Sequence, residues 1–354
     1  MSSETYVARA LTDETQLRVR YFHARLKFKA TDREQVTATA ATPYQSHGPE
    51  NIYNMIGVQI TPNGPTVRFS PAKRCIYCGA REYAPGYDRP LGEEHIVSEG
   101  MGGTLILPEA SCLECEGATS AAETTVLGGM LWAPRHKLKL PMKRSKIKRT
   151  KFPVTAFVDG KEVNFSLPLD THPTMLFFLP LRTPGILAGR PIGHSGIRGF
   201  WLRGLNDLAK ANALELWSPS VDTVRFCQFL AKTGHSFAMA MIGDSCLVPL
   251  LPEFIRRRFG KDEQYPECYH LIGGDVDRPP SNVLHEVGGA FAMYANQWYL
   301  TVHMRFFANL GAPTYVAVVG ALKPGITPEV ATARAVVPTE FLGLRNDETL
   351  SPHS

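Results

Sequence analysis

Four cysteines occur as two Cys-x-x-Cys pairs, Cys75 with Cys78 and Cys112 with Cys115. Thiolates are soft ligands, and one such pair lets both sulfurs reach the same ion, so the two pairs predict a tetrahedral Cys₄ zinc site that stabilises the fold. The alternative is a redox or disulfide role. Residues 1–7 are polar and carry no apolar signal region, so we expect the cytoplasm, where disulfides are rare. No strand–helix–strand pattern surrounds either pair, as a redox motif would require, and structural zinc is therefore favoured.

The segment between the two pairs contains a second group of residues that could do chemistry. It carries Glu94 followed directly by His95, and a glycine turn at 100–103. The apolar stretch after His95, the turn and the stretch 104–107 predict a strand, a turn and a strand. A helix is expected over 116–127. An isolated Glu-His pair is most often a solvated turn, but the position of this pair between two predicted zinc knuckles favours a catalytic role.

The order Cys-x-x-Cys, Glu-His-Ile, Gly-Gly, Cys-x-x-Cys and polar helix resembles the HNH endonucleases, within residues 75–130. It is most similar to their zinc-stapled subgroup, which implies a ββα-metal module. By this resemblance His95 would be the general base, and Glu94 and Glu116 would bind a catalytic Mg²⁺ or Mn²⁺. Glu109 would orient the imidazole. Family members commonly have Asn at the positions of Glu116 and Glu109, so a module that has lost catalysis is an alternative.

The expected reaction is hydrolysis of a phosphodiester bond. A histidine that titrates near neutral pH suits the activation of water, and one divalent ion can polarise the phosphate. The resemblance implies products with a 5′-phosphate and a 3′-hydroxyl. We expect Glu93, Glu99 and Glu123 to be solvated, with Glu123 the best reserve ligand. Two other readings remain: a non-catalytic, zinc-dependent nucleic-acid-binding protein, and an unrelated protein whose zinc is architectural.

A basic segment follows the predicted helix, and no Asp or Glu occurs between Glu123 and Asp159. Such a density of positive charge predicts contact with the phosphates of nucleic acid, and we expect double-stranded DNA as the partner. The alternative is a solvated basic loop, and the net charge of +5 decides little. The candidate phosphate-binding residues are Arg135, Lys137, Lys139, Lys143, Arg144, Lys146, Lys148 and Arg149.

The whole chain of 354 residues is long enough for several domains, with 44% hydrophobic and 20% charged residues. No apolar run approaches the ~20 residues that span a bilayer, so no membrane partner is expected. The predicted fold class is α+β. The predicted division is a β-rich N-terminal segment (1–73), an HNH nuclease module (74–131), a basic arm (132–151), an α+β domain of unknown role (152–326) and a tail (327–354).

The C-terminal half shows secondary structure but no catalytic constellation. A hairpin is expected at 152–167, a helix at 221–241, and strands at 298–307 and 314–322. This half could serve target recognition, formation of a homodimer or regulation, and the sequence does not choose among them. Its isolated histidines are expected to be core or surface residues with ordinary hydrogen-bond partners: His235, His270, His285 and His303. Its scattered cysteines are expected to be small buried hydrophobic residues: Cys227, Cys246 and Cys268.

Overall fold

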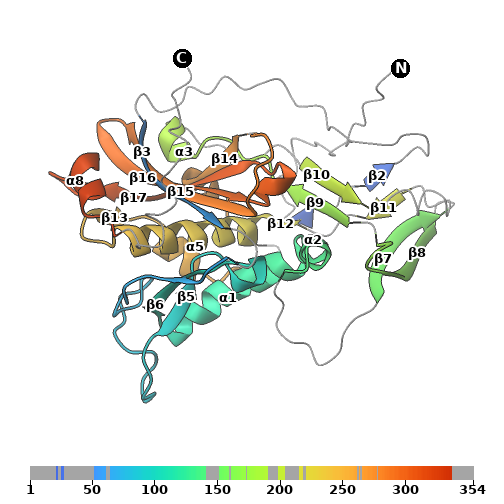
Figure 1. Cartoon of the computed structure of the whole chain (residues 1–354), viewed down its shortest axis with the longest axis horizontal. Helices are drawn as coiled ribbons and strands as arrows, with labels where there is room; N and C mark the ends of the chain where they lie inside the picture. The colour runs from blue at the N-terminus through green and yellow to red at the C-terminus, as the bar shows by residue number, and fades with distance from the viewer. Residues whose placement is uncertain are drawn as a thin grey trace.

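The protein is a mixed α+β structure, as the sequence predicted. The computed structural model (Figure 1) describes residues 21–22, 25–27, 52–60, 64–140, 151–158, 161–172, 174–189, 198–203, 215–217, 221–260, 263, 265–276 and 278–336. In this part of the chain, no helix is long and apolar enough to cross a membrane.

The largest sheet has six strands and is antiparallel throughout. Strands β15 (His285–Tyr294) and β16 (Gln297–Phe306) form its central hairpin, and β17 (Thr314–Leu322) follows beside β16. Strand β3 (Ile52–Ile60) from the N-terminal half adds to the outer edge of β15. The other edge is formed by β13 (Leu247–Pro249), and β14 (Ile272–Val276) also pairs with β17.

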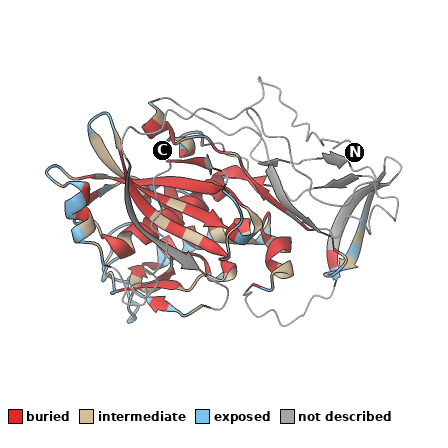
Figure 2. Cartoon of the chain, turned by 45° about the horizontal axis from the view of Figure 1, so that its top comes forward, coloured by how far each residue is buried: buried red, intermediate tan, exposed pale blue. Residues whose placement is uncertain are grey.

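Helix α5 (Thr223–Met241) lies against this sheet, and almost all of its residues are buried. Its N-terminus is capped by the Asp222 side chain, which accepts a hydrogen bond from the Arg225 backbone N–H at 3.0 Å. The helix is enclosed because the sheet covers one face and helix α1 (Leu113–Gly128) covers the other (Figures 1 and 2). Gly234 weakens the helical pattern, but a Cβ there would lie 2.9 Å from the Ala317 Cβ, so glycine permits the close contact with β17.

The segment between the two cysteine pairs forms a third layer, on the far side of α5 from the sheet. Strands β5 (Gly92–His95) and β6 (Leu105–Ser111) pair in antiparallel fashion, and α1 follows β6 directly. Strand β4 (Val67–Arg68) pairs with β6 in parallel. The expectation of a first strand after His95 was wrong: β5 ends at His95, and the fully buried Ile96 and Val97 lead into the 3₁₀ helix η1 (Glu99–Met101).

The predicted glycine turn is present. Gly102 has a φ of 78°, in the left-handed region that favours glycine. A Cβ on Gly103 would overlap the Val97 carbonyl, because the two backbone segments touch at this point. Both glycines are therefore needed for the chain to return from η1 into β6.

The remaining described elements are small. The predicted hairpin is confirmed as β7 (Lys151–Val158) and β8 (Lys161–Pro168). It belongs to a four-stranded sheet with the order β2-β11-β7-β8. The other elements are β1 (Tyr21–Phe22), β2 (Arg25–Lys27), β9 (Thr174–Phe178), β10 (Arg198–Arg203), β11 (Glu215–Trp217), β12 (Val221–Asp222), α2 (Trp132–Lys137), α3 (Gly185–Ala188), α6 (Pro252–Arg256), α7 (Cys268–Leu271), η2 (Ala308–Leu310) and α8 (Pro328–Ala333).

One apolar core joins the cysteine-bearing segment to the C-terminal half. It runs from Val67 and the residues around Cys75 through α5 to the sheet and to Ala331 in α8. Figure 2 shows this continuity as buried residues on the sheet strands and the helix beneath them. The hairpin β5–β6 and helix α1 are therefore packed on α5 rather than attached through a linker alone.

Candidate metal centre and the ion cluster beside it

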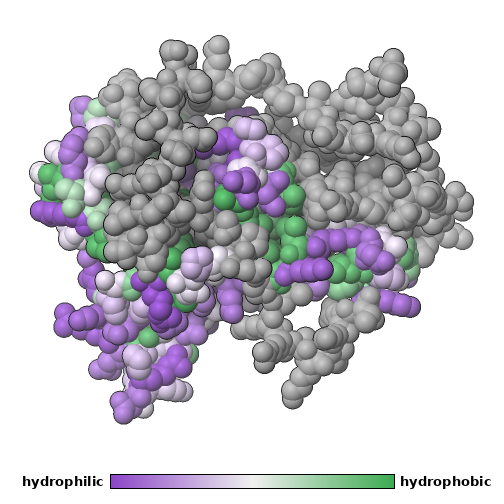
Figure 3. Space-filling view, viewed as in Figure 1, coloured by the Kyte–Doolittle hydropathy of each residue, from purple (hydrophilic) through white to green (hydrophobic). Residues whose placement is uncertain are grey.

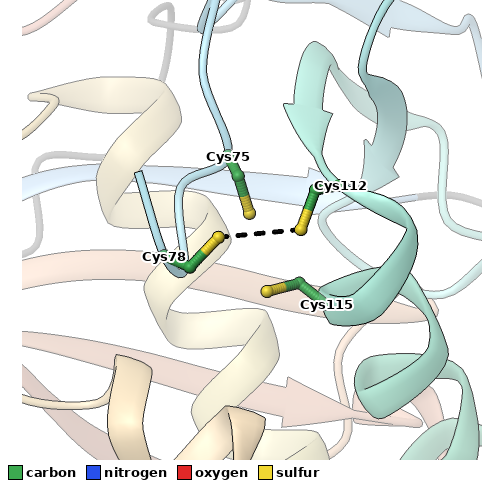
Figure 4. A group of neighbouring side chains, drawn as sticks. All are labelled: Cys75, Cys78, Cys112 and Cys115. Atoms are coloured by element: carbon green, nitrogen blue, oxygen red, sulfur yellow. Dashed lines mark hydrogen bonds between the residues drawn. The ribbon is translucent and has the colours of Figure 1, made fainter. Parts of the chain in front are cut away.

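The four predicted zinc ligands converge on one point. Their sulfur atoms all lie within 4.8 Å of one another, and the Sγ atoms of Cys78 and Cys112 are 3.6 Å apart (Figure 4). Four sulfurs held tetrahedrally at about 2.3 Å from zinc would be about 3.8 Å apart, so the arrangement fits this ion. All seven cysteines of the chain are free thiols. The expectation of a Cys₄ metal site is thus confirmed in its geometry.

Local backbone structure fixes the position of each pair of cysteines. The first pair lies on a turn in which the Gly79 N–H donates to the Cys75 carbonyl at 2.9 Å and the Cys75 N–H donates to the Ala80 carbonyl at 2.7 Å. The second pair begins helix α1, with Cys112 at its N-cap. Hydrogen bonds from Cys115 and from neighbouring backbone amides lower the pKa of the Cys75 thiol to about 4. At neutral pH this sulfur is a thiolate, the form that binds zinc.

Beside the sulfur cluster lies a buried group of three charges. The Lys232 ammonium on α5 is 2.6 Å from the Glu94 carboxylate on β5 and 2.9 Å from the Glu123 carboxylate on α1. It also donates to the backbone carbonyl of His95. The Lys232 and Glu94 side chains are 2% and 6% exposed, whereas Glu123 is 22% exposed. The expectation that Glu123 is solvated was therefore wrong: one carboxylate oxygen lies beside Lys232, and the other accepts a hydrogen bond from the Ser98 hydroxyl at 3.3 Å.

Burial governs the protonation of this group. It raises the pKa of Glu94, an effect that the neighbouring Lys232 opposes. Despite burial, the two carboxylates raise the pKa of Lys232, so the ammonium stays charged at neutral pH. In this buried ion network, the pKa of each group is therefore affected by the charge of its neighbours.

His95 lies at the end of β5 with its ring half-buried. Its Nδ1 atom is buried and has no hydrogen-bond partner among the described residues. Burial, and then the nearby Lys232 charge, lower the pKa of His95 below its usual 6.5. The imidazole is therefore neutral at pH 7 and can accept a proton.

The expected partners of Glu94 and His95 lie elsewhere. The Glu116 carboxylate accepts a hydrogen bond from the Tyr83 hydroxyl at 2.9 Å and lies 3.8 Å from Arg89. Glu109 makes no hydrogen bond to the His95 ring. Since His95 pairs with Ile106 across the hairpin, Glu109 is three residues further along β6, or about 10 Å. Among the described residues, only the four cysteines gather three or more candidate metal ligands.

The basic segment is described only in part. Arg135 is buried at 8% exposure, and its guanidinium donates to the carbonyls of Gly100 at 2.5 Å and Leu127 at 3.0 Å. Its side chain is thus occupied within the fold rather than presented to a phosphate, which corrects the expectation for this residue. Lys137 donates to the Asp170 carbonyl at 2.9 Å, and Lys139 is exposed. The other candidates lie outside the described residues: Lys143, Arg144, Lys146, Lys148 and Arg149.

The surface near the zinc ligands is hydrophilic. The loop between the first cysteine pair and β5, residues 79–90, is mostly exposed and forms the lower-left projection in Figures 1 and 3. Within it, the Arg89 guanidinium lies 3.5 Å from the centre of the Tyr83 ring. This contact is of the cation–π type and holds the arginine against the loop.

Sequence reasoning missed the contribution of helix α5 to this site. Besides Lys232, the ring of His235 hydrogen-bonds the Ile76 carbonyl at 2.8 Å, and the Tyr77 hydroxyl is 3.0 Å from the Ser236 hydroxyl. The expectation that His235 is a satisfied core histidine is confirmed only for its Nε2 atom, because its Nδ1 atom is buried and has no hydrogen-bond partner among the described residues. His285 likewise contacts the Met101 carbonyl at 2.7 Å. The one available signal was a lysine directly after apolar residues in the middle of a predicted helix, because a lysine is rarely buried unless its charge is paired.

No family model, curated protein or solved structure matches this chain.

Proposed function

We propose that this chain is a nuclease of the HNH type, in which His95 is the general base for hydrolysis of a phosphodiester bond. The observation that carries the proposal is the state of His95. Its half-buried ring stands at the end of β5 beside a buried ion cluster, its Nδ1 atom is buried without a hydrogen-bond partner among the described residues, and burial lowers its pKa below the usual value. Buried charges beside a histidine with a lowered pKa are more frequent at functional sites than elsewhere in proteins.

In the proposed reaction, the imidazole takes a proton from water as the water oxygen bonds to phosphorus. The bond from phosphorus to the 3′ oxygen breaks, and the leaving oxygen takes a proton from solvent. A positioned base of this kind contributes typically 10²–10⁴-fold to a rate. The products would be a 5′-phosphate and a 3′-hydroxyl.

The second metal that the resemblance implies does not fit as expected. Glu94 is paired with Lys232, and Glu116 is turned toward Tyr83 and Arg89. Glu94 and Glu116 therefore do not form one ligand set for Mg²⁺ or Mn²⁺ in this arrangement. No step of the proposed mechanism passes through such an ion.

The zinc site has a supporting role. When bound, zinc would join the turn before β5 to the start of α1 through Cys75, Cys78, Cys112 and Cys115. This link would hold the hairpin against the helix and keep His95 in place. We also propose a reducing compartment such as the cytoplasm, because the four thiols bind zinc only when reduced.

A second candidate function is a zinc-dependent nucleic-acid-binding protein without catalysis. The observation that favours it is the Lys232 ammonium, which already neutralises Glu94. In both candidates the partner is nucleic acid, with double-stranded DNA proposed first. The exposed Lys139 and the basic residues that follow it would contact phosphates.

The test is a plasmid-nicking assay with purified, zinc-loaded protein, run with Mg²⁺, with Mn²⁺ and without added metal. Wild type is compared with His95→Ala and with His270→Ala, which removes an exposed histidine on α7. We expect nicking that falls at least a hundredfold in His95→Ala and is unchanged in His270→Ala. Equal nicking by His95→Ala would overturn the mechanism. Plasmid binding without cleavage would favour the second candidate.

A further inference from the structure

The ammonium of Lys232 has a complete set of partners. Its nitrogen lies 2.6 Å from the Glu94 carboxylate and 2.9 Å from the Glu123 carboxylate, and it donates to the His95 carbonyl, so three oxygens surround a group that carries three N–H donors. The side chain reaches this position from a helix 137 residues away from His95 in sequence. It is the only described lysine among the buried residues.

The acceptors have the chemistry of a cation site. Two carboxylates and a backbone carbonyl are hard oxygen ligands, the set that Mg²⁺ and Mn²⁺ prefer. They come from two elements, Glu94 and His95 from β5 and Glu123 from α1, and all three lie around the Lys232 nitrogen. The formal charges of the two carboxylates and of Lys232 sum to −1, so the cluster still favours positive charge at its centre.

We propose that Lys232 is a built-in cation that occupies the position of a divalent metal ion between Glu94 and Glu123. The wild-type protein then takes up zinc at its cysteines but no second metal at the ion cluster. Removal of the ammonium should create a Mn²⁺ site on Glu94, Glu123 and the His95 carbonyl. This assignment concerns cation binding alone, and it holds whether or not the chain cleaves nucleic acid.

The test is Mn²⁺ binding by zinc-loaded, full-length protein. Free Mn²⁺ is followed by electron paramagnetic resonance, and the melting temperature is measured with and without Mn²⁺. The variants are Lys232→Ala, Lys232→Gln, Glu94→Gln and the double variant Lys232→Ala with Glu123→Gln. Lys151→Ala is a control that removes an exposed lysine at the start of β7.

We expect Lys232→Ala to bind one Mn²⁺ at least tenfold more tightly than wild type does, and to melt at a higher temperature when Mn²⁺ is present. The added Glu123→Gln change should remove this gain, and Lys151→Ala should behave as wild type. The proposal is overturned if wild type binds Mn²⁺ and Glu94→Gln abolishes that binding. It is also overturned if folded Lys232→Ala gains no affinity.

Loss of folding is an informative outcome as well. If Lys232→Ala is unfolded alone but folds when Mn²⁺ is added, the ion has replaced the ammonium and the proposal stands. If neither Lys232→Ala nor Lys232→Gln folds with or without Mn²⁺, a metal cannot replace the ammonium and the proposal fails. None of these readouts depends on cleavage, so failure of the nuclease proposal would be seen separately.

Discussion

The two polar clusters of this molecule are neighbours, but they are built in opposite ways. The sulfur cluster takes two ligands from the turn at Cys75 and Cys78 and two from the start of helix α1, and each segment has its own backbone hydrogen bonds. The ion cluster takes Glu94 from a strand, Glu123 from the following helix, and Lys232 from a helix far along the chain. The first is specified by local spacing, and the second exists only when the tertiary fold is complete.

This difference has an energetic side. A structural zinc site adds folding free energy directly through metal–sulfur bonds. In a buried ion cluster, by contrast, the attraction between charges mainly offsets the cost of removing them from water. Substitutions near the four cysteines should therefore change the free energy of unfolding little. Loss of one member of the ion cluster should lower it strongly.

Loss of a zinc ligand should have the largest effect. In Cys115→Ser one thiolate is gone, and structural zinc is worth about 10–16 kcal/mol in small zinc-binding peptides. We expect loss of bound zinc and unfolding of the hairpin and α1. The measurements are metal analysis and thermal unfolding, with Cys246→Ser as a control because Cys246 is buried outside the sulfur cluster. A variant that kept one zinc per chain and its wild-type melting temperature would contradict the assignment.

Removal of the central cation should come next. Lys232→Met leaves Glu94 and Glu123 close together and buried, which should cost about 3–5 kcal/mol of unfolding free energy. Chemical denaturation would measure this loss. Addition of Glu94→Gln should restore part of the stability, because it removes one of the unpaired charges. A loss below about 1 kcal/mol in Lys232→Met would mean that the three groups are not coupled.

Low pH should lower the free energy of unfolding of the C-terminal half, because its buried histidines resist protonation. Burial lowers the pKa of His285 and of His303 to about 4, whereas an unfolded histidine titrates near 6.5. Below pH 6.5 the unfolded chain therefore binds more protons, and stability falls as the pH drops from 6.5 to 4. At pH 5.5 each histidine should contribute about 1 kcal/mol of this loss. The unfolding free energy of His285→Gln should depend less on pH than that of wild type, and an equal dependence would contradict this origin.

The smallest effect is expected at Glu116. Its side chain is 47% exposed, so Glu116→Gln should change stability by less than about 1 kcal/mol. Zinc content should also stay the same. A hundredfold fall in nicking activity in this variant, but not in Glu123→Gln, would support Glu116 as the metal ligand on the helix that the resemblance implies.

The sequence predicted the local features well. The α+β class, the four clustered cysteines, the hairpin at Lys151–Pro168 and the helix up to Met241 were all expected. These depend on spacing and periodicity within short segments. The glycine turn after η1 was expected for the same reason.

The ion cluster could not be predicted in the same way. Nothing in the residues near Glu94 indicates that Lys232 would reach it, because that contact depends on how α5 packs between the sheet and α1. The start of the first strand was misplaced because Ile96 and Val97 are buried in the core without being extended in a sheet. The expectation for Arg135 was wrong because its guanidinium donates hydrogen bonds to the carbonyls of Gly100 and Leu127 within the fold.

The most direct test of the account is the single-turnover rate of cleavage of a labelled DNA duplex, measured against pH for wild type and His95→Ala. For wild type, we predict a rate that falls as the pH drops through the lowered pKa of His95 and is level above it. The rate for His95→Ala should be at least a hundredfold lower and should lack this dependence. Equal rates and pH profiles for the two proteins, or no cleavage by folded and zinc-loaded wild type, would contradict the assignment of His95 as a general base.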